Sequence, residues 1–265
     1  MRVFVEGVGL AGPGLCGWTA SRAVLAGAEP YAHAATVVTA SDLLPAAERR
    51  RVSVPVKLAL AAGCEALLNA SRDAAATASV FTSSAGDGEN LHRICETLAS
   101  PAREMSPTRF HNCVHNAPAG YWSIATRCRE TSTSLCCHDG SFAAGLLDAA
   151  VQVAVDGKPV VLIAYDQPYS EPLHALRPIS ASFGMALVIS PQVTSQAIAA
   201  LEISFSPRSE NETRMRDPGL EALRSGVPSA RSLTLLGALA RAAAETIVVA
   251  CAADNQLRIA VAPCC

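Results

Sequence analysis

The chain has 265 residues, which is long enough for one large domain or two small ones and for a sizeable hydrophobic core. Half of the residues are hydrophobic and only 17% are charged, a composition that excludes an intrinsically disordered chain. The formal net charge of −2 gives no overall positive field, so we expect no nucleic-acid partner.

The hydrophobic segments predict neither an export signal nor a membrane span. Met1–Leu10 contains Glu6 and lacks the basic segment and long apolar core of a signal peptide. The longest apolar stretch, Leu233–Ala253, is interrupted by Arg241 and Glu245. We therefore expect a cytoplasmic protein whose ten cysteines are mostly reduced.

The first part of the chain predicts alternating strands and helices. A strand over Arg2–Glu6 ends at Gly7, a glycine-rich bend follows through Gly17, and residues 18–50 are irregular. The later elements are helices over 56–73, 89–98, 115–127 and 141–155, and strands over 78–82, 132–137 and 160–165. The short connections between 132 and 165 predict parallel strands with a right-handed crossover.

The second part predicts fewer elements and one long polar segment, residues 206–228, which we expect to be a loop or linker. The predicted elements are strands over 183–189 and 200–205, a helix over 232–244, and a terminal hairpin of strands over 246–251 and 256–261. This order, together with a composition rich in Ala, Val and Leu, predicts an α/β fold.

The segment Gly7–Gly12 matches the glycine pattern of dinucleotide-binding loops, where a helix begins and binds pyrophosphate through its free N–H groups. Here Pro13 and Gly14 follow, and no helical periodicity begins. A strand ending in an acidic residue about twenty positions later is also lacking. We therefore interpret the glycines as a turn after the first strand and expect no cofactor.

Histidines and cysteines cluster in three places: His92 with Cys95, His111 with Cys113 and His115, and Cys136 and Cys137 with His138. A zinc site needs side chains that converge on one point, usually from paired ligands at short spacing. Adjacent cysteines on a strand point to opposite faces and do not converge. We therefore expect no metal ion in these clusters.

Residues 116–145, NAPAGYWSIATRCRETSTSLCCHDGSFAAG, predict a helix, a strand, a sharp bend and a second helix. A residue in the bend lies at a helix N-terminus, where the dipole and the free N–H groups stabilise an anion and lower the pKa of a thiol. Nucleophilic cysteines occupy such positions. An ordinary strand-to-helix connection has the same pattern, so this pattern alone leaves both interpretations open.

This segment resembles the N-terminal half of β-ketoacyl synthases, which have the thiolase fold. Those enzymes have an Asn-x-x-Ala-Gly helix, a strand, and a Thr-Ala-Cys-x-Ser bend that bears the nucleophile. Similar stretches within residues 1–205 are the Gly-Val-Gly strand of Arg2–Gly14, the Ala-rich residues 57–70, Arg177-Pro178 and Phe183-Gly184. Two stretches are most similar to short chain-length-factor-like proteins of aryl-polyene and xanthomonadin-type pigment pathways. These stretches are HNCVHNAPAGYWSIAT and DGSFAAGLLDA.

The catalytic positions depart from this family pattern. An ungapped alignment from Asn116 through Ser141 places Asp139 where the nucleophilic cysteine belongs, with Cys137 two residues earlier. Synthases also use two histidines from their second half, in His-Gly-Thr and Gly-His contexts. After His138 this chain has only His174, in neither context. We therefore expect no catalytic residue at these positions and no chain condensation by this subunit alone.

The resemblance implies an α/β, thiolase-like fold that corresponds mainly to the N-terminal half of a ketosynthase, with a truncated second half. The expected parts are a ketosynthase N-terminal-like domain over 1–205, the polar loop or linker over 206–228, and a helix plus terminal hairpin over 229–265 that packs on the same core. The implied function is a non-catalytic, chain-length-factor-like subunit in polyketide or fatty-acid-type (aryl polyene) biosynthesis. It pairs with a full-length β-ketoacyl synthase as a heterodimer and meets acyl carrier protein only indirectly.

Synthase dimers join through the strand before the nucleophile, here residues 131–137, and through the helix before it. The resemblance therefore implies partner-interface or tunnel contacts for Phe110, His111, Tyr121, Trp122, Ser132 and Ser134. Neighbouring residues on a helix are about 100° apart. We therefore expect Trp122 to point into the subunit's own core and Tyr121 to face the partner.

A second interpretation is a cysteine-dependent acyltransferase or thioesterase that acts through Cys136 or Cys137 with His138. It requires the nucleophile to lie two or three residues earlier in the bend than it does in the synthase pattern. Iodoacetamide labelling distinguishes the two interpretations, because only this one predicts a single hyper-reactive cysteine at position 136 or 137.

Overall fold

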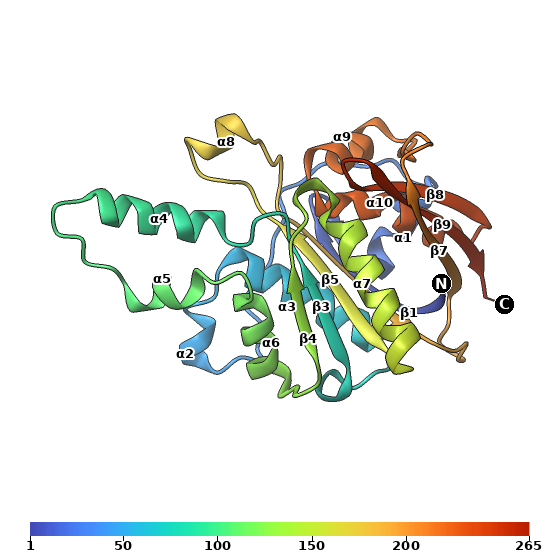
Figure 1. Ribbon diagram of the computed structural model, residues 1–265, viewed down its shortest axis with the longest axis horizontal. Helices are drawn as coiled ribbons and strands as arrows, with labels where there is room; N and C mark the ends of the chain where they lie inside the picture. The colour runs from blue at the N-terminus through green and yellow to red at the C-terminus, as the bar shows by residue number, and fades with distance from the viewer. Residues whose placement is uncertain (265) are drawn as a thin grey trace.

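The computed structural model describes residues 1–264, which form a mixed sheet of nine strands with helices on both faces (Figure 1). The strands are β1 (Arg2–Gly12), β2 (Leu15–Cys16), β3 (Ala78–Thr82), β4 (Ser132–Leu135), β5 (Val160–Asp166), β6 (Phe183–Ser190), β7 (Ala199–Pro207), β8 (Glu245–Ala252) and β9 (Asn255–Pro263). Their order is β4-β3-β5-β6-β1-β7-β9-β8, and β2 pairs with the end of β1. The β4–β3 and β3–β5 pairs are parallel, so β4 and β5 run in the same direction, as predicted.

The helices form one layer on each face of the sheet. They are α1 (Trp18–Ala26), α2 (Ala46–Arg49), α3 (Val54–Asn69), α4 (Gly88–Ala99), α5 (Pro107–Asn112), α6 (Ala117–Thr126), α7 (Ser141–Asp156), α8 (Leu173–Leu176), α9 (Pro218–Gly226) and α10 (Leu233–Arg241). Helix α3, with α6 beside it, covers one face, and α7 covers the other. Helices α4 and α5 extend away from the sheet (Figure 1). No helix within residues 1–264 combines the length and the hydropathy needed to cross a membrane.

Two hydrophobic cores lie on opposite faces of the sheet because side chains alternate along its buried strands. Val80 of β3 and Leu162 of β5 pack toward α7, whereas their neighbours Phe81 and Ile163 pack toward α3 and α6. Strands buried on both faces contain nearly continuous apolar residues, as the sequence of β5 and β6 shows.

The glycine-rich segment Gly7–Gly12 is part of strand β1, so its interpretation as a turn is wrong. The glycines allow α3 to approach the strand closely. A Cβ added at Gly9 would lie 1.9 Å from the carbonyl oxygen of Ala62, and one at Gly7 would lie 2.1 Å from that of Ala66. The residues therefore serve helix–sheet packing, for which glycine leaves room.

The other predicted elements are present with small shifts of their ends, and five short helices, α1, α2, α5, α8 and α9, were missed. Helix α1 lies in the segment expected to be irregular, as does α2, and α5 precedes α6. Helix α9 lies within residues 206–228, which we expected to be a loop, and its Leu220 and Leu223 are buried in the core. The terminal hairpin is confirmed as β8 and β9, and it extends the sheet through β7.

The two edges of the sheet differ. At β8, the segment after β7 covers the edge, because Thr213 N donates to Val248 O and Val248 N donates to Thr213 Oγ1, each at 2.9 Å. At the opposite edge, β4 pairs with β3 alone among the strands within residues 1–264. An uncovered edge presents free backbone groups to another chain, so β4 is the edge available for pairing.

Candidate functional site

The bend between β4 and α7 is fixed by its own hydrogen bonds. After β4 ends at Leu135, a 3₁₀ turn over His138–Gly140 leads directly into α7. The Ser141 hydroxyl accepts a hydrogen bond from Cys137 N at 2.9 Å and donates one to His138 O at 2.7 Å. His138 has a φ of 50°, a conformation that non-glycine residues rarely adopt. The turn therefore sets the direction of the side chains before and after it.

Strand β8 packs directly on this bend. A Cβ added at Gly140 would lie 1.6 Å from the carbonyl oxygen of Cys251 in β8. Only a residue without a side chain fits between the bend and the strand. The terminal hairpin is therefore part of the wall around this site.

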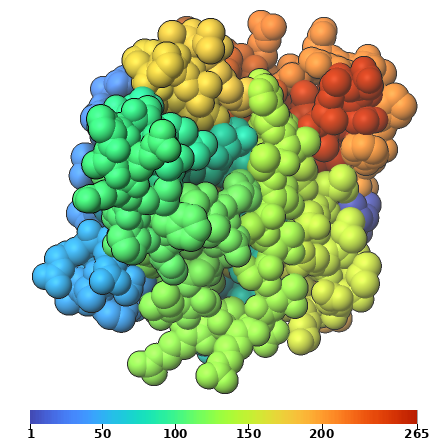
Figure 2. All heavy atoms as spheres, turned by 60° about the vertical axis from the view of Figure 1, so that its left-hand side comes forward, coloured from blue at the N-terminus to red at the C-terminus, as the bar shows by residue number. Residues whose placement is uncertain are grey.

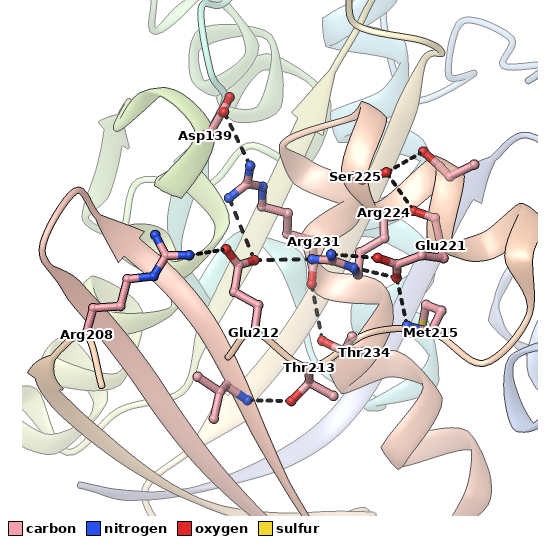
Figure 3. Close-up of polar contacts among 12 residues, drawn as sticks. Asp139, Arg208, Glu212, Thr213, Met215, Glu221, Arg224, Ser225, Arg231 and Thr234 are labelled. Atoms are coloured by element: carbon pink, nitrogen blue, oxygen red, sulfur yellow. Dashed lines mark hydrogen bonds and ion pairs between the residues drawn. The ribbon is translucent and has the colours of Figure 1, made fainter. Parts of the chain in front are cut away.

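Asp139 occupies the bend as an ion-paired carboxylate (Figure 3). Its Oδ1 lies 2.9 Å from Arg177 Nη2, and its Oδ2 lies 3.3 Å from Arg231 Nη2. The His138 ring also lies near it, with 3.5 Å between Nδ1 and Oδ1. Asp139, Arg177 and Arg231 line a small cavity of about 240 Å³. The carboxylate is thus directed at two guanidinium groups.

A chain of ion pairs continues from Arg231 into the C-terminal part of the protein (Figure 3). Arg231 Nη1 lies 3.9 Å from Glu212 Oε2, which is 3.3 Å from Arg224 Nη1. Arg224 is buried and makes two 2.8 Å hydrogen bonds to Glu221. The hydrogen bonds from Arg224 lower the pKa of the Glu221 carboxyl despite its partial burial. The network connects the bend to α9 and to the turn before α10.

We expect Asp139→Asn to lower the free energy of unfolding by about 1 kcal/mol or less, because exposed ion pairs and helix caps contribute on this scale. The Asp139 side chain is 46% exposed, so water screens its charge. Urea unfolding measures this cost. In a complex with a catalytic partner, product formation should be nearly unchanged. Complete loss of product from a normally assembled complex would instead indicate a chemical role for the carboxylate.

The thiols of the bend and the His138 ring have separate hydrogen-bond partners. The His138 ring hydrogen-bonds to Arg177 and lies beside Asp139. The Cys137 thiol instead donates to Cys251 O, with 3.5 Å between Sγ and O. Cys136 is exposed. In the described part of the chain, no hydrogen bond joins either thiol to His138, the contact that a cysteine nucleophile and its base require.

Three of the predicted interface residues line one apolar groove between α5 and α6. Phe110, His111 and Tyr121 border a cavity of about 670 Å³, and Phe110 is 64% exposed. Figure 2 shows the green segment that contains α5 and α6 in the middle of one face, with the yellow-green β4–α7 segment beside it. The groove therefore lies on the same face of the molecule as the β4–α7 segment, which contains the bend.

The remaining predicted residues lie in two other environments. Ser132 and Ser134 belong to the edge strand β4, where Ser79 Oγ donates to Ser132 Oγ at 3.2 Å. Trp122 is buried in the core beneath α6, as expected. The expectation that Tyr121 faces outward is wrong for the single chain, because the side chain is 2% exposed and its hydroxyl donates to Asn112 Oδ1 at 3.0 Å. Helix α5, which we did not predict, covers it.

Sequence reasoning missed most of the residues that surround Asp139. Arg177 was recognised only as part of a family motif. Arg231 and Glu212 had no motif, and Glu212 lies in the segment interpreted as a linker. The sequence nevertheless contains a helix-start signal at α9, because Asp217 is its N-cap and Pro218 lies in its first turn. That signal predicts a helix, but not the ion pairs.

Comparison with solved structures gives the same architecture. A chain in the complex of a ketosynthase (ApeO) with its chain length factor (ApeC) from Xenorhabdus doucetiae matches with a TM-score of 0.74 and 21% identity, covering 98% of this chain and 99% of that one. A chain of the ishigamide ketosynthase/chain length factor matches with a TM-score of 0.72 and 13% identity, covering 99% of both chains. A chain of the AntDE:AntF complex, a type II polyketide synthase acyl carrier protein with its ketosynthase, matches with a TM-score of 0.73 and 12% identity, again covering 99% of both.

At these identities the structural matches establish the fold. A search of curated proteins gave no significant match. The family model of the β-ketoacyl synthase N-terminal domain matches residues 18–249, which is most of the chain. This protein therefore belongs to the β-ketoacyl synthase N-terminal domain family and has its thiolase-like fold.

Proposed function

We propose that this protein is a non-catalytic, chain-length-factor-like subunit that pairs with a full-length β-ketoacyl synthase. The observation that carries the proposal is the ion-paired Asp139 at the position of the family's nucleophile. A carboxylate that two guanidinium groups neutralise is a poor acyl acceptor, because acyl transfer requires an activated nucleophile. The length of the chain supports the proposal, since it covers nearly all of chains found in ketosynthase complexes with chain length factors.

The surroundings of Asp139 support the absence of condensation chemistry. A synthase needs histidines that contact the thioester beside the nucleophile. Within residues 1–264, no histidine other than His138 makes a hydrogen bond or ion pair with Asp139. His174 belongs to the short helix α8, and no motif of the family surrounds it. The partner subunit must therefore supply the nucleophile and the histidines, and it receives the acyl chains from the carrier protein.

The proposed partner surface combines the open edge of β4 with the groove between α5 and α6. Strand β4 carries Ser132 and Ser134 and has free backbone groups for pairing. The groove adds exposed apolar side chains, namely Phe110, Val114 and Ile124. An apolar patch next to an open strand edge is typical of a protein interface. In the assembled pair, we infer that Phe110 and His111 lie nearest the partner's acyl tunnel and limit the product length.

From the resemblance of the HNCVHNAPAGYWSIAT segment, we infer that the pair acts in polyketide or fatty-acid-type biosynthesis of aryl polyenes. The product is then a polyene chain whose length depends on the space that the two subunits enclose. Enlarging that space at Phe110 should lengthen the product, whereas the identity of the starter unit depends on the catalytic partner.

We expect Phe110→Asp to weaken the complex with a full-length ketosynthase from the same genome at least tenfold. Placing a charge in a buried interface costs more than the roughly 1.4 kcal/mol that a tenfold change in Kd represents. The free subunit should keep its melting temperature, because Phe110 is exposed there. Co-purification and a binding titration measure the effect.

The matched control is Phe205→Asp. Phe205 is 52% exposed on β7, which lies in the sheet far from β4. This variant should bind the partner like the wild type. If Phe205→Asp dissociates the complex and Phe110→Asp does not, the proposed surface is wrong. If a complex with Cys136→Ser and Cys137→Ser assembles normally but makes no product, acyl transfer through a cysteine replaces the non-catalytic proposal.

A further inference from the structure

Two cysteines from distant parts of the chain meet where the terminal hairpin contacts the bend. Cys137 lies in the bend, and Cys251 lies near the end of β8. The Cys137 thiol donates to the Cys251 carbonyl oxygen, with 3.5 Å between Sγ and O. The backbone of Cys251 also packs on the bend, since a Cβ added at Gly140 would lie 3.3 Å from Cys251 Cα. The Cys137 sulfur atom is therefore already positioned over the residue that carries the second thiol.

The strand is irregular at this residue. The pairing of β8 with β9 shifts its register between Ala250 and Ala252, so Cys251 lies at a bulge. A bulge changes the direction of the side chain it carries. Burial raises the pKa of the Cys251 thiol, and the charge of a Cys137 thiolate raises it further.

We propose that Cys137 and Cys251 form a reversible disulfide when the protein meets a peroxide, and that this bond ties the bend to strand β8. Cys137 is half-buried and reachable from solvent, whereas Cys251 is 6% exposed. Cys137 therefore reacts first, and Cys251 is the resolving thiol. Rotation of the two side chains should bring the sulfur atoms together, because the Cys137 sulfur already contacts the Cys251 carbonyl oxygen.

The chemistry consists of two steps with hydrogen peroxide as the oxidant. The Cys137 sulfur attacks one peroxide oxygen, the O–O bond breaks, and the products are a sulfenic acid and one water that carries the thiol proton. The Cys251 sulfur then attacks the Cys137 sulfur, the S–O bond breaks, and the hydroxyl group leaves as water with the Cys251 proton. Two thiols are oxidised by two electrons in total, and the peroxide is reduced to two waters.

Peptide mapping of the whole purified chain tests the proposal. After treatment with hydrogen peroxide and blocking of free thiols, trypsin and an enzyme that cleaves before aspartate release residues 130–138 and 242–253. The first peptide contains Cys136 and Cys137, and the second contains Cys251 as its one cysteine. We expect these two peptides to appear joined by a disulfide, and the joined species to disappear on treatment with dithiothreitol.

Single variants identify the pair. The joined peptides should persist in Cys136→Ser and disappear in Cys137→Ser. On oxidation, the melting temperature should rise by about 4 °C or more in the wild type and in Cys136→Ser, but not in Cys137→Ser. Cys137→Ser keeps the buried residue intact, so it tests the bond even if Cys251→Ser fails to fold. Persistence of the joined peptides in Cys137→Ser, or oxidation of Cys137 without any joined peptide in the wild type, would overturn the proposal.

Discussion

Gly140→Ala should be among the most destabilising single-methyl additions in this protein, with a loss of about 3 kcal/mol in the free energy of unfolding. The added Cβ would lie 1.6 Å from the carbonyl oxygen of Cys251, and that atom belongs to the backbone of β8. The terminal hairpin must move away from the bend to accept it. The backbone of Gly140, at φ −86° and ψ 7°, is accessible to alanine, so the cost is steric.

The measurement is thermal unfolding, in which this loss corresponds to a decrease of about 6–12 °C for a chain of this size. Gly120→Ala is the matched control, because Gly120 lies within helix α6 and no atom lies within 4 Å of its added Cβ. Alanine is a better helix former, so this variant should melt at the same temperature or slightly higher. If Gly140→Ala also melts like the wild type, the hairpin does not pack on the bend as described.

The sequence predicted the sheet because its buried strands have short apolar runs and its βαβ unit has short connections. It failed at β1 because the glycines were judged by their local turn preference. Their actual role depends on α3, which lies more than fifty residues later and packs against them. Local patterns cannot reveal a long-range contact that requires the absence of a side chain.

Two of the missed helices, α5 and α9, have recognisable beginnings in the sequence. Helix α5 follows Ser106 and Pro107, and α9 follows Asp217 and Pro218, each a capping residue with proline in the first turn. We instead interpreted residues 206–228 as a loop or linker and predicted no element at α5. Helix α1 has no such start signal, because its N-cap residue is Gly17, which has no side chain to accept a hydrogen bond. Its end is marked by Gly27, a glycine C-cap.

At the candidate site, spacing located Asp139 but not its partners. The position of Asp139 follows from an ungapped stretch of 26 residues between Asn116 and Ser141, a distance over which a helix and a strand preserve register. Arg231 and Glu212 lie more than seventy residues away along the chain, and only the packing of the C-terminal part on the bend brings them near. Ion pairs between such distant segments depend on the assembled fold.

The neighbouring aromatic residues of α6 should respond differently to substitution, although both are buried. Tyr121→Phe removes the hydroxyl that donates to Asn112 Oδ1, and we expect a loss of about 1 kcal/mol, as for other single hydrogen bonds. The ring still fills the space beneath α5. Urea unfolding followed by circular dichroism measures this cost. If Tyr121→Phe lowers the free energy of unfolding as much as we expect for Trp122→Ala below, the Tyr121 hydroxyl, and not its ring, holds α5 in place.

Trp122→Ala should lower the free energy of unfolding by about 3–5 kcal/mol, because it removes a large side chain from the core between α6 and the sheet. The indole is 1% exposed and packs edge-on against Phe81, with 6.0 Å between the ring centroids. It also fills the space above Gly63 of α3, where an added Cβ would lie 2.6 Å from its Cζ3 atom.

Trp122→Phe is the companion variant that keeps the experiment decisive if the alanine variant does not fold. The indole Nε1 has no hydrogen-bond partner within residues 1–264, so phenylalanine removes an unpaired buried donor while leaving a smaller cavity. We expect a cost of about 1–2 kcal/mol for this variant, measured by circular dichroism because the chain has only two tryptophans for fluorescence. If both variants unfold like the wild type, Trp122 does not pack in the subunit's own core. Its ring would then be free to face a partner, and the assignment of the α5–α6 groove to the interface would have to be revised around it.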